Sequence, residues 1–180
     1  MNEPRFYSEE PKRSLGTFLD DDVYMRAVES LIIVCTDFVP VDRARRVIYL
    51  SKRIVHSARG VWRFGGRQRA GETIHDSCTR IAKRELGLLI PPKRFMYLTT
   101  AEDLWAWRKQ EPQNTGAHNL THIFSIECTP NELALASIHL DPSEYDTSFG
   151  IQEFDRARLV AENVRPQIID MYDALFPSSL

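Results

Sequence analysis

A helix that carries a carboxylate on its apolar face is the feature of this sequence that points most directly to chemistry. Ile74, Cys78 and Ile81 recur at helical spacing and form one apolar stripe, and Glu85 falls on the same stripe. An unpaired carboxylate in apolar surroundings is costly, and the helix dipole disfavours it further in the last turn. Because the adjacent Arg84 is expected to point away, we expect a bound Mg²⁺ ion to compensate Glu85.

The boundaries of this helix are marked in the sequence. Thr73 followed by Asp76 predicts a capping box, and Gly87 predicts the C-terminal stop. Two glycines and two arginines precede the helix in the segment GGRQR (65–69). Glycine lets a backbone approach a ligand closely, and guanidinium groups match diphosphate oxygens. Together these features predict a site for Mg²⁺ and a diphosphate group.

The segment 66–88 (GRQRAGETIHDSCTRIAKRELGL) resembles a Nudix box, G-x5-E-x7-R-E-U-x-E-E-x-G-U, in which U is aliphatic. Ile81 and Arg84 replace two of its glutamates. The branch called GDP-mannose mannosyl hydrolases also lacks these two, and the likeness to it extends over residues 31–164. The resemblance implies an α/β (α+β) fold, a Nudix-type mixed-sheet α/β/α sandwich, and a homodimer. The residues that match the box are Gly66, Glu72, Arg80, Glu85, Gly87 and Leu88.

The resemblance to that branch also implies a reaction. Glu85, the Gly66 carbonyl and the diphosphate of a small-molecule nucleoside-diphosphate substrate would hold one Mg²⁺ ion, with Mn²⁺ as a substitute. Arg53 and Arg67 would donate to the diphosphate oxygens as their charge grows. Water would attack the anomeric carbon of a sugar nucleotide such as GDP-mannose or GDP-glucose.

The general base for that reaction stays open. The branch has a Gln-His pair before its last core strand, and counting along the chain places this pair at Glu144 and Tyr145. A second count places it at Thr147 and Ser148. We prefer the first count, because Glu144 then supplies a second metal ligand. Tyrosine is a poor base near neutral pH, since its reference pKa is about 10; the alternative bases are His122, His139 and Asp146.

Two other functions remain open. One is an ordinary Nudix pyrophosphohydrolase, in which water attacks phosphorus and other carboxylates such as Glu144, Asp146 or Glu153 complete the site. The other is a non-catalytic module that senses a nucleotide. In each case Trp105 and Trp107 are candidates for stacking on a nucleobase.

Composition and charge disfavour several kinds of partner. The 180 residues carry a formal net charge of −2, and Lys and Arg are spread along the chain, which disfavours nucleic acid as a partner. No apolar run reaches the length of a membrane span, so no membrane partner is expected. Three widely spaced cysteines, expected to be reduced thiols, indicate a cytoplasmic protein; they are Cys35, Cys78 and Cys128.

We expect an irregular N-terminal arm over residues 1–24 and one Nudix-like domain over residues 25–180. The arm is a candidate for packing on a partner subunit. Apolar runs predict strands at 30–35, 47–50, 60–66, 95–100, 120–128 and 149–154, with a glycine turn at the end of the third. Residues 37–46 are expected to form a hairpin loop, and helices are expected at 72–86, 156–162 and 166–176.

Overall fold

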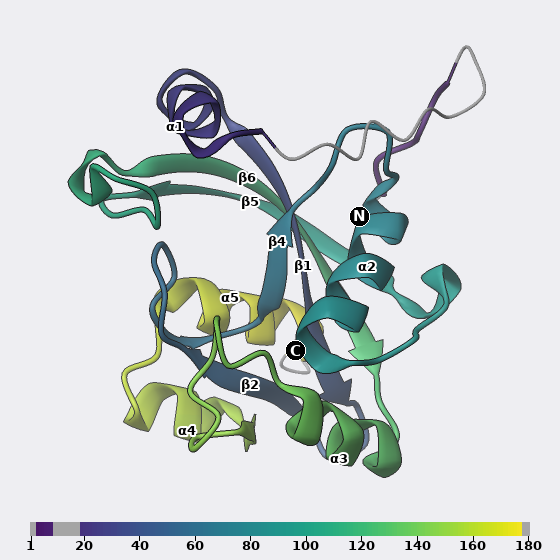
Figure 1. Cartoon of the computed structure of the whole chain (residues 1–180). Coiled ribbons are helices and arrows are strands. Elements are labelled where there is room, and N and C mark those ends of the chain that lie inside the picture. Colours follow the sequence, from purple (N-terminus) through teal and green to yellow (C-terminus); the bar gives the residue numbers. More distant parts are fainter. Residues whose placement is uncertain (1–2, 9–18, 178–180) are drawn as a thin grey trace.

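The structure is a computed structural model that describes residues 3–8 and 19–177 (Figure 1). Within these ranges, seven strands form one mixed sheet and five α-helices surround it. None of these helices is both long and apolar enough to cross a membrane. The strands are β1 Ile33–Asp42, β2 Val47–Arg53, β3 Gly60–Trp62, β4 Phe64–Arg67, β5 Met96–Trp105, β6 Ala117–Glu127 and β7 Ile151–Phe154. The helices are α1 Asp21–Ser30, α2 Ile74–Leu86, α3 Pro130–His139, α4 Arg156–Ala161 and α5 Pro166–Leu175, with short 3₁₀ turns at Pro92–Arg94 and Gln113–Thr115.

Strand β1 is the centre of the sheet. It runs parallel to β6 from the Ile33–Asn119 pair to the Val41–Glu127 pair. On its other edge it pairs antiparallel first with β4 and then with β2. The order is β3-β2-β1-β6-β5, with β4 on β1 and β7 on β2. A strand with neighbours on both edges and helices on both faces is buried nearly throughout, as this one is.

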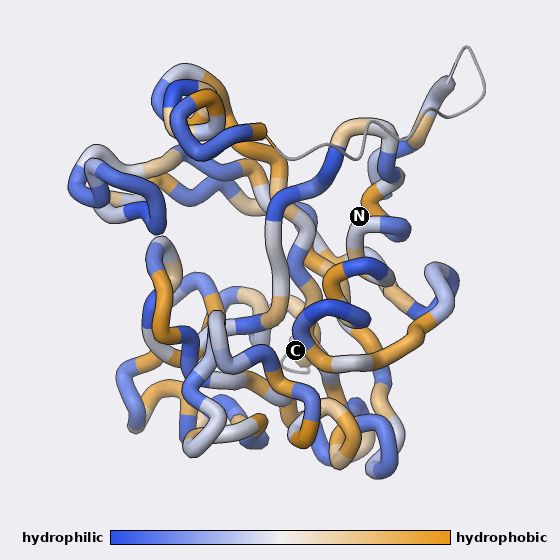
Figure 2. The backbone as a smooth tube through the Cα atoms, in the orientation of Figure 1, coloured by the Kyte–Doolittle hydropathy of each residue, from blue (hydrophilic) through white to orange (hydrophobic). Residues whose placement is uncertain are grey.

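Helices cover both faces of the sheet, so the predicted α/β/α sandwich is confirmed. Phe38 points into a core formed with α2 and α3, whereas Val39 points into a second core formed with α4 and α5. Alternate residues of β6 divide in the same way, with Phe124 in the first core and Ile123 in the second. The loop that joins β5 to β6 is largely hydrophilic (Figure 2).

The predicted hairpin loop over residues 37–46 is wrong, because β1 continues to Asp42 and only residues 43–46 form the turn. Proline has no N–H for a sheet hydrogen bond and is usually confined to strand edges and irregularities. Pro40 is tolerated because the pairing with β4 ends at Phe38 and that with β2 begins at Val41. The proline therefore lies in the gap between two partners.

Two further expectations change. The glycine turn is wrong, since Gly65 and Gly66 lie inside β4 and pair with β1. The boundary between arm and domain at residue 24 falls inside α1, and residues 1–2 and 9–18 of the arm lie outside the described residues. Helix α3 was not foreseen, although Thr129, Pro130 and Glu132 form a capping box with proline in the first turn.

Candidate functional site

Helix α2 brings Glu85 to the site, as its sequence predicts. Thr73 and Asp76 form the capping box, with the Asp76 N–H donating to Thr73 Oγ1 at 3.1 Å. Gly87 ends the helix in the left-handed region at φ 65°. His139 of α3 fills the space beside Gly87. A Cβ atom on Gly87 would lie 2.7 Å from the His139 Cβ atom. The C-terminal end of α2 is therefore packed against α3, and Glu85 is only 1% exposed.

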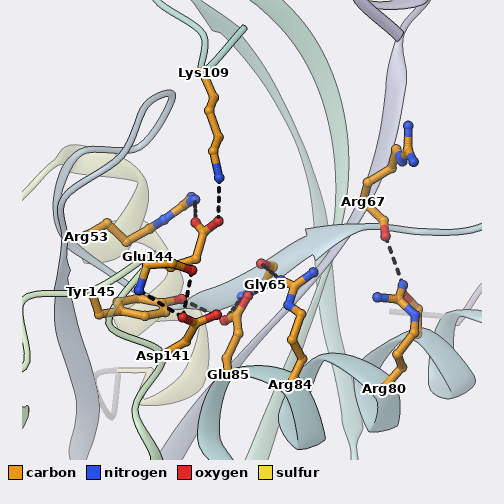
Figure 3. A network of polar contacts seen from close by, with 12 residues as sticks. Arg53, Gly65, Arg67, Arg80, Arg84, Glu85, Lys109, Asp141, Glu144 and Tyr145 are labelled. Atoms are coloured by element: carbon orange, nitrogen blue, oxygen red, sulfur yellow. Dashed lines mark hydrogen bonds and ion pairs between the residues drawn. The ribbon is translucent and has the colours of Figure 1, made fainter. Parts of the chain in front are cut away.

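Three groups of the chain already satisfy the Glu85 carboxylate (Figure 3). The Tyr145 hydroxyl and the Gly65 N–H both donate to Glu85 Oε2, at 2.7 and 3.1 Å. The guanidinium of Arg84 pairs with Oε1. The expectation that Arg84 points away is therefore wrong, because its long side chain turns back over the helix end. Burial raises the pKa of the Glu85 carboxyl, and Arg84 is the strongest influence that opposes the rise.

Tyr145 contacts Glu85 as a hydrogen-bond donor. The turn that carries it is tied to the helix end, since the Asp141 N–H donates to the Glu85 carbonyl and the Tyr145 N–H to the Asp141 carbonyl, each at 3.0 Å. Burial raises the pKa of the Tyr145 phenol well above its usual value, and the Glu85 charge adds to the rise. A phenol in this position keeps its proton, so the structure argues against Tyr145 as the general base.

Glu144 is paired with cations and does not face Glu85 as a second ligand would. Arg53 Nη2 lies 2.7 Å from Glu144 Oε2, and Lys109 Nζ lies 3.1 Å from Oε1. Burial opposes ionisation of Glu144, but Arg53 and Lys109 together lower its pKa. The predicted residues Arg53 and Glu144 are thus brought together, as partners of each other.

A cleft of about 360 Å³ opens beside these residues. Its lining has six cationic side chains against four acidic ones, and two tryptophans, Trp62 and Trp105. A volume of this size suits a small-molecule ligand, and the excess of cations suits an anion. The cationic residues are Arg53, Arg63, Arg67, Arg84, Arg108 and Lys109, and the acidic ones are Asp21, Asp37, Asp103 and Glu144.

Arg63 and Arg108, which are each 1% exposed, were not predicted from the sequence. Arg63 Nε lies 2.9 Å from Asp37 Oδ2, and Arg108 Nη2 lies 2.9 Å from Glu29 Oε1. In both, Nη1 is buried and has no hydrogen-bond partner among residues 3–8 and 19–177. Arg63 could have been identified from the sequence, because it is a charged residue between Trp62 and Phe64 in an apolar run. Arg108 could not, because it lies in a polar loop where charged residues are common.

Arg67, a predicted substrate-binding residue, lines the cleft and contacts both the ring and the hydroxyl of Tyr24. Its guanidinium lies 4.3 Å from the centre of the Tyr24 ring, and no carboxylate of residues 3–8 or 19–177 is within ion-pair distance of it. Its carbonyl accepts from Arg80 at 3.0 Å, and Arg80 pairs with Glu72 as predicted, at 2.5 and 2.8 Å. The Glu72–Arg80 pair thereby fixes the backbone of Arg67.

Neither His122 nor Trp107 lines the cleft, although Trp107 stacks on His56, which does. His122 is on the α2 face of β6, where its Nδ1 lies 3.0 Å from Thr100 Oγ1, and burial lowers its pKa. The cleft lies on the opposite face, which holds the neighbouring Thr121. Trp107 is 51% exposed and stacks on His56 with ring centres 5.8 Å apart. Trp105 lines the cleft in its place.

Solved structures share this arrangement of sheet and helices. A MutT Nudix hydrolase from Burkholderia pseudomallei superimposes with a TM-score of 0.58, at 16% identity, over 83% of this chain and 100% of its own. A Nudix hydrolase from Nitrosomonas europaea gives a TM-score of 0.56, at 15% identity, over 79% of this chain and 87% of its own. This chain has the Nudix hydrolase fold. No protein-family model matches the sequence, and neither does any curated protein. At these identities the likeness concerns the Nudix fold alone.

The side chains of this Nudix-fold protein do not fit the expected Mg²⁺ ion. Both oxygens of Glu85 have partners, and Glu144 is held by two cations. Among the described residues, no three His, Cys, Asp or Glu side chains are placed to hold a metal. An ion between Glu85 and Gly66 would also lie against the guanidinium of Arg84, where two positive charges repel.

Proposed function

We propose that this Nudix-fold protein binds a nucleoside-diphosphate derivative, with the diphosphate among the arginines of the cleft. The observation that carries the proposal is the excess of cationic side chains in the cleft lining, among which Arg63 and Arg108 are buried and each keep an Nη1 atom with no acceptor among the described residues. Leaving a buried charged donor unsatisfied is costly, and phosphate oxygens are the acceptors that arginine binds best. Arg67, which has no carboxylate partner, adds a third donor.

The aromatic part of the cleft supports a nucleoside rather than inorganic phosphate. Trp62 and Trp105 pack edge to face with ring centres 5.6 Å apart, and both line the cleft. Indole rings offer flat faces on which any nucleobase stacks, so the partly exposed Trp105 can give affinity without defining the base, while the buried Trp62 supports its ring. A ligand that places its base against Trp105 and its diphosphate against Arg67 would use both parts of the cleft.

Calorimetric titration with GDP, UDP, ADP and their sugar derivatives tests this proposal, with inorganic pyrophosphate as the aromatic-free probe. Nucleotides are expected to bind more tightly than pyrophosphate. Arg67→Ala should weaken nucleotide binding, whereas Arg26→Ala, which removes the same charge from an exposed position outside the cleft, should not. If no nucleotide binds, or if both variants bind as the parent does, the proposed site is wrong.

Hydrolysis of the bound compound is a second candidate, because both similar structures are named Nudix hydrolases. The resemblance of the box favours a nucleoside-diphosphate sugar such as GDP-mannose or GDP-glucose, with water attacking the sugar carbon. Turnover in ¹⁸O-labelled water separates the possibilities: label in the sugar supports attack at carbon, and label in phosphate supports an ordinary pyrophosphohydrolase. The assay is run with Mg²⁺, with Mn²⁺ and with neither. Tight binding without turnover would identify a nucleotide sensor.

A further inference from the structure

We propose that the guanidinium of Arg84 acts as a built-in cation at the end of α2, so that the diphosphate ligand binds there directly and without a divalent metal. This inference rests on the proposed nucleotide-binding function and specifies how the site meets its ligand. It follows from a disagreement, because Arg84 pairs with Glu85 where Mg²⁺ was expected, and Glu144 is held by Arg53 and Lys109.

The position of Arg84 carries the argument. Its Nη2 pairs with Glu85 Oε1 and lies 3.5 Å from the Gly65 carbonyl oxygen. It also lies 3.1 Å from the point where a Cβ atom on Gly66 would be. The Glu85 carboxylate, which the sequence assigns to Mg²⁺, therefore contacts this guanidinium, and the Gly65–Gly66 backbone lies beside it. Arg84 lines the cleft and its side chain is 43% exposed, so the cation faces the ligand space (Figure 3).

The printed contacts of Arg84 leave part of its hydrogen-bonding capacity unused. Its contacts with Glu85 and Gly65 use Nη2 alone, which leaves the N–H groups of Nε and Nη1 for a ligand. Guanidinium groups bind phosphate oxygens through pairs of such donors, and they stay protonated at any accessible pH. Arg84 can thus supply both the charge and the directed contacts that a metal-bridged diphosphate would otherwise obtain from the ion.

The partners of Glu85 also oppose metal binding. Mg²⁺ requires oxygen lone pairs at about 2.0–2.1 Å in near-octahedral geometry. Glu85 Oε2 already accepts from the Gly65 N–H and the Tyr145 hydroxyl. A metal would have to displace Arg84 from Oε1 and leave it nearby as a like charge. The residue at position 84 therefore determines whether a guanidinium or a metal ion can occupy the place beside Glu85.

Mn²⁺ titration followed by electron paramagnetic resonance tests the inference without any assay of activity. The parent protein is expected to leave Mn²⁺ free. Arg84→Glu places a second carboxylate beside Glu85 and should create a Mn²⁺ site, which Glu85→Gln added to Arg84→Glu should abolish. Arg84→Gln is the control that removes the cation and adds no charge. If the parent binds Mn²⁺ and Glu85→Gln abolishes that binding, the inference is overturned.

Titration with GDP, once in the presence of EDTA and once in the presence of Mg²⁺, is the second test of the inference. The parent should bind GDP at least as tightly in EDTA, and Arg84→Gln should weaken that binding by about tenfold or more, the loss expected for one charged hydrogen-bonding partner. GDP binding that requires Mg²⁺ overturns the inference and leaves the proposed function intact. If GDP and the other nucleotides fail to bind under either condition, the proposed function fails and this inference fails with it.

Discussion

The guanidinium of Arg84 lies against the carboxylate of Glu85, its neighbour in the sequence, at the buried end of α2. Adjacent residues of a helix point about 100° apart, so such a pair forms only where the helix ends and a long side chain can turn back. Burial raises the pKa of Glu85 and Arg84 opposes that rise. Arg84 is therefore the largest of the influences that favour the charged form of the buried carboxylate, and Tyr145 and Arg53 add to it.

Removing that cation should change the titration of Glu85. We predict that Arg84→Gln raises the pKa of the Glu85 carboxyl above its value in the parent, measured by ¹³C NMR of labelled glutamate side chains. Lys83→Gln is the matched control, because Lys83 occupies the same helical turn, is exposed and has no contact with Glu85. Superimposable Glu85 titrations in the parent and in Arg84→Gln would contradict the prediction.

The same substitution should alter the pH dependence of stability. A carboxyl whose folded-state pKa is raised stabilises the fold fully below its unfolded pKa, about 4.3, and loses this contribution as pH rises through the folded value. Because Arg84→Gln raises the folded pKa of Glu85 further, the free energy of unfolding should fall more steeply with pH in the variant. Urea unfolding from acidic to neutral pH measures the slope, and equal slopes would count against the pair.

Tyr145 offers a test of structural against catalytic roles. Tyr145→Phe removes the donor that lies 2.7 Å from Glu85 Oε2 and leaves the ring in the core. Loss of a buried hydrogen bond to a charged group should lower the free energy of unfolding by about 1.5–3 kcal/mol. Tyr49→Phe, which removes only a long surface contact with Arg45 at 3.5 Å, should change it much less. Unchanged stability with lost turnover would instead restore Tyr145 as a catalytic residue.

The two glycines of β4 should respond differently to alanine. A Cβ atom on Gly65 would lie 1.8 Å from Asp37 Oδ1 and 2.9 Å from Asp37 Cα, so both a side chain and a backbone would have to shift. We expect Gly65→Ala to destabilise the fold by about 1–3 kcal/mol. A Cβ on Gly66 meets only the tip of the flexible Arg84 side chain at 3.1 Å, so Gly66→Ala should preserve stability and displace that guanidinium. Thermal unfolding compares the two, and equal losses would contradict the distinction.

Local signals predicted the framework of the site but not its chemistry. The capping box at Thr73, the stop at Gly87 and the buried position of Glu85 all follow from patterns within one helix, and all three are confirmed. The conformation of Arg84 was predicted wrongly because helical geometry fixes the direction of the Cα–Cβ bond and not the path of a long side chain past the helix end.

The cationic cleft could not be found by local reading, because distant segments build it. Arg63 from β3–β4 and Arg108 from the loop after β5 lie 45 positions apart in the sequence numbering and line the same cleft. Only the tertiary arrangement shows that Arg63 pairs with Asp37 of β1. His122 was misplaced for a related reason: β6 lies between two cores, and the sequence does not state which face an isolated histidine occupies.

The final prediction concerns the acid stability of α3, which packs against α2. Glu132 closes the capping box of α3 and pairs with Arg94, whose Nη2 lies 3.0 Å from its Oε2. The hydrogen bonds from Arg94 lower the pKa of Glu132 to about 2. A lowered folded pKa gives stability that is present above the unfolded value of about 4.3 and is lost as pH falls through the folded value.

Glu132→Gln should therefore lower the free energy of unfolding by about 1 kcal/mol near neutral pH, since it removes a charged partner from a half-exposed pair and weakens a cap. The difference from the parent should shrink as pH falls below about 4 and vanish only below the folded pKa of about 2, where the parent carboxyl is itself mostly protonated. Glu162→Gln, which breaks an exposed pair with Arg158 at 2.6 Å, is the control and should cost only about 0.3–0.5 kcal/mol. Urea unfolding across this pH range measures both variants. A gap between parent and Glu132→Gln that stays constant down to the folded pKa would show that the carboxyl is not held ionised by Arg94.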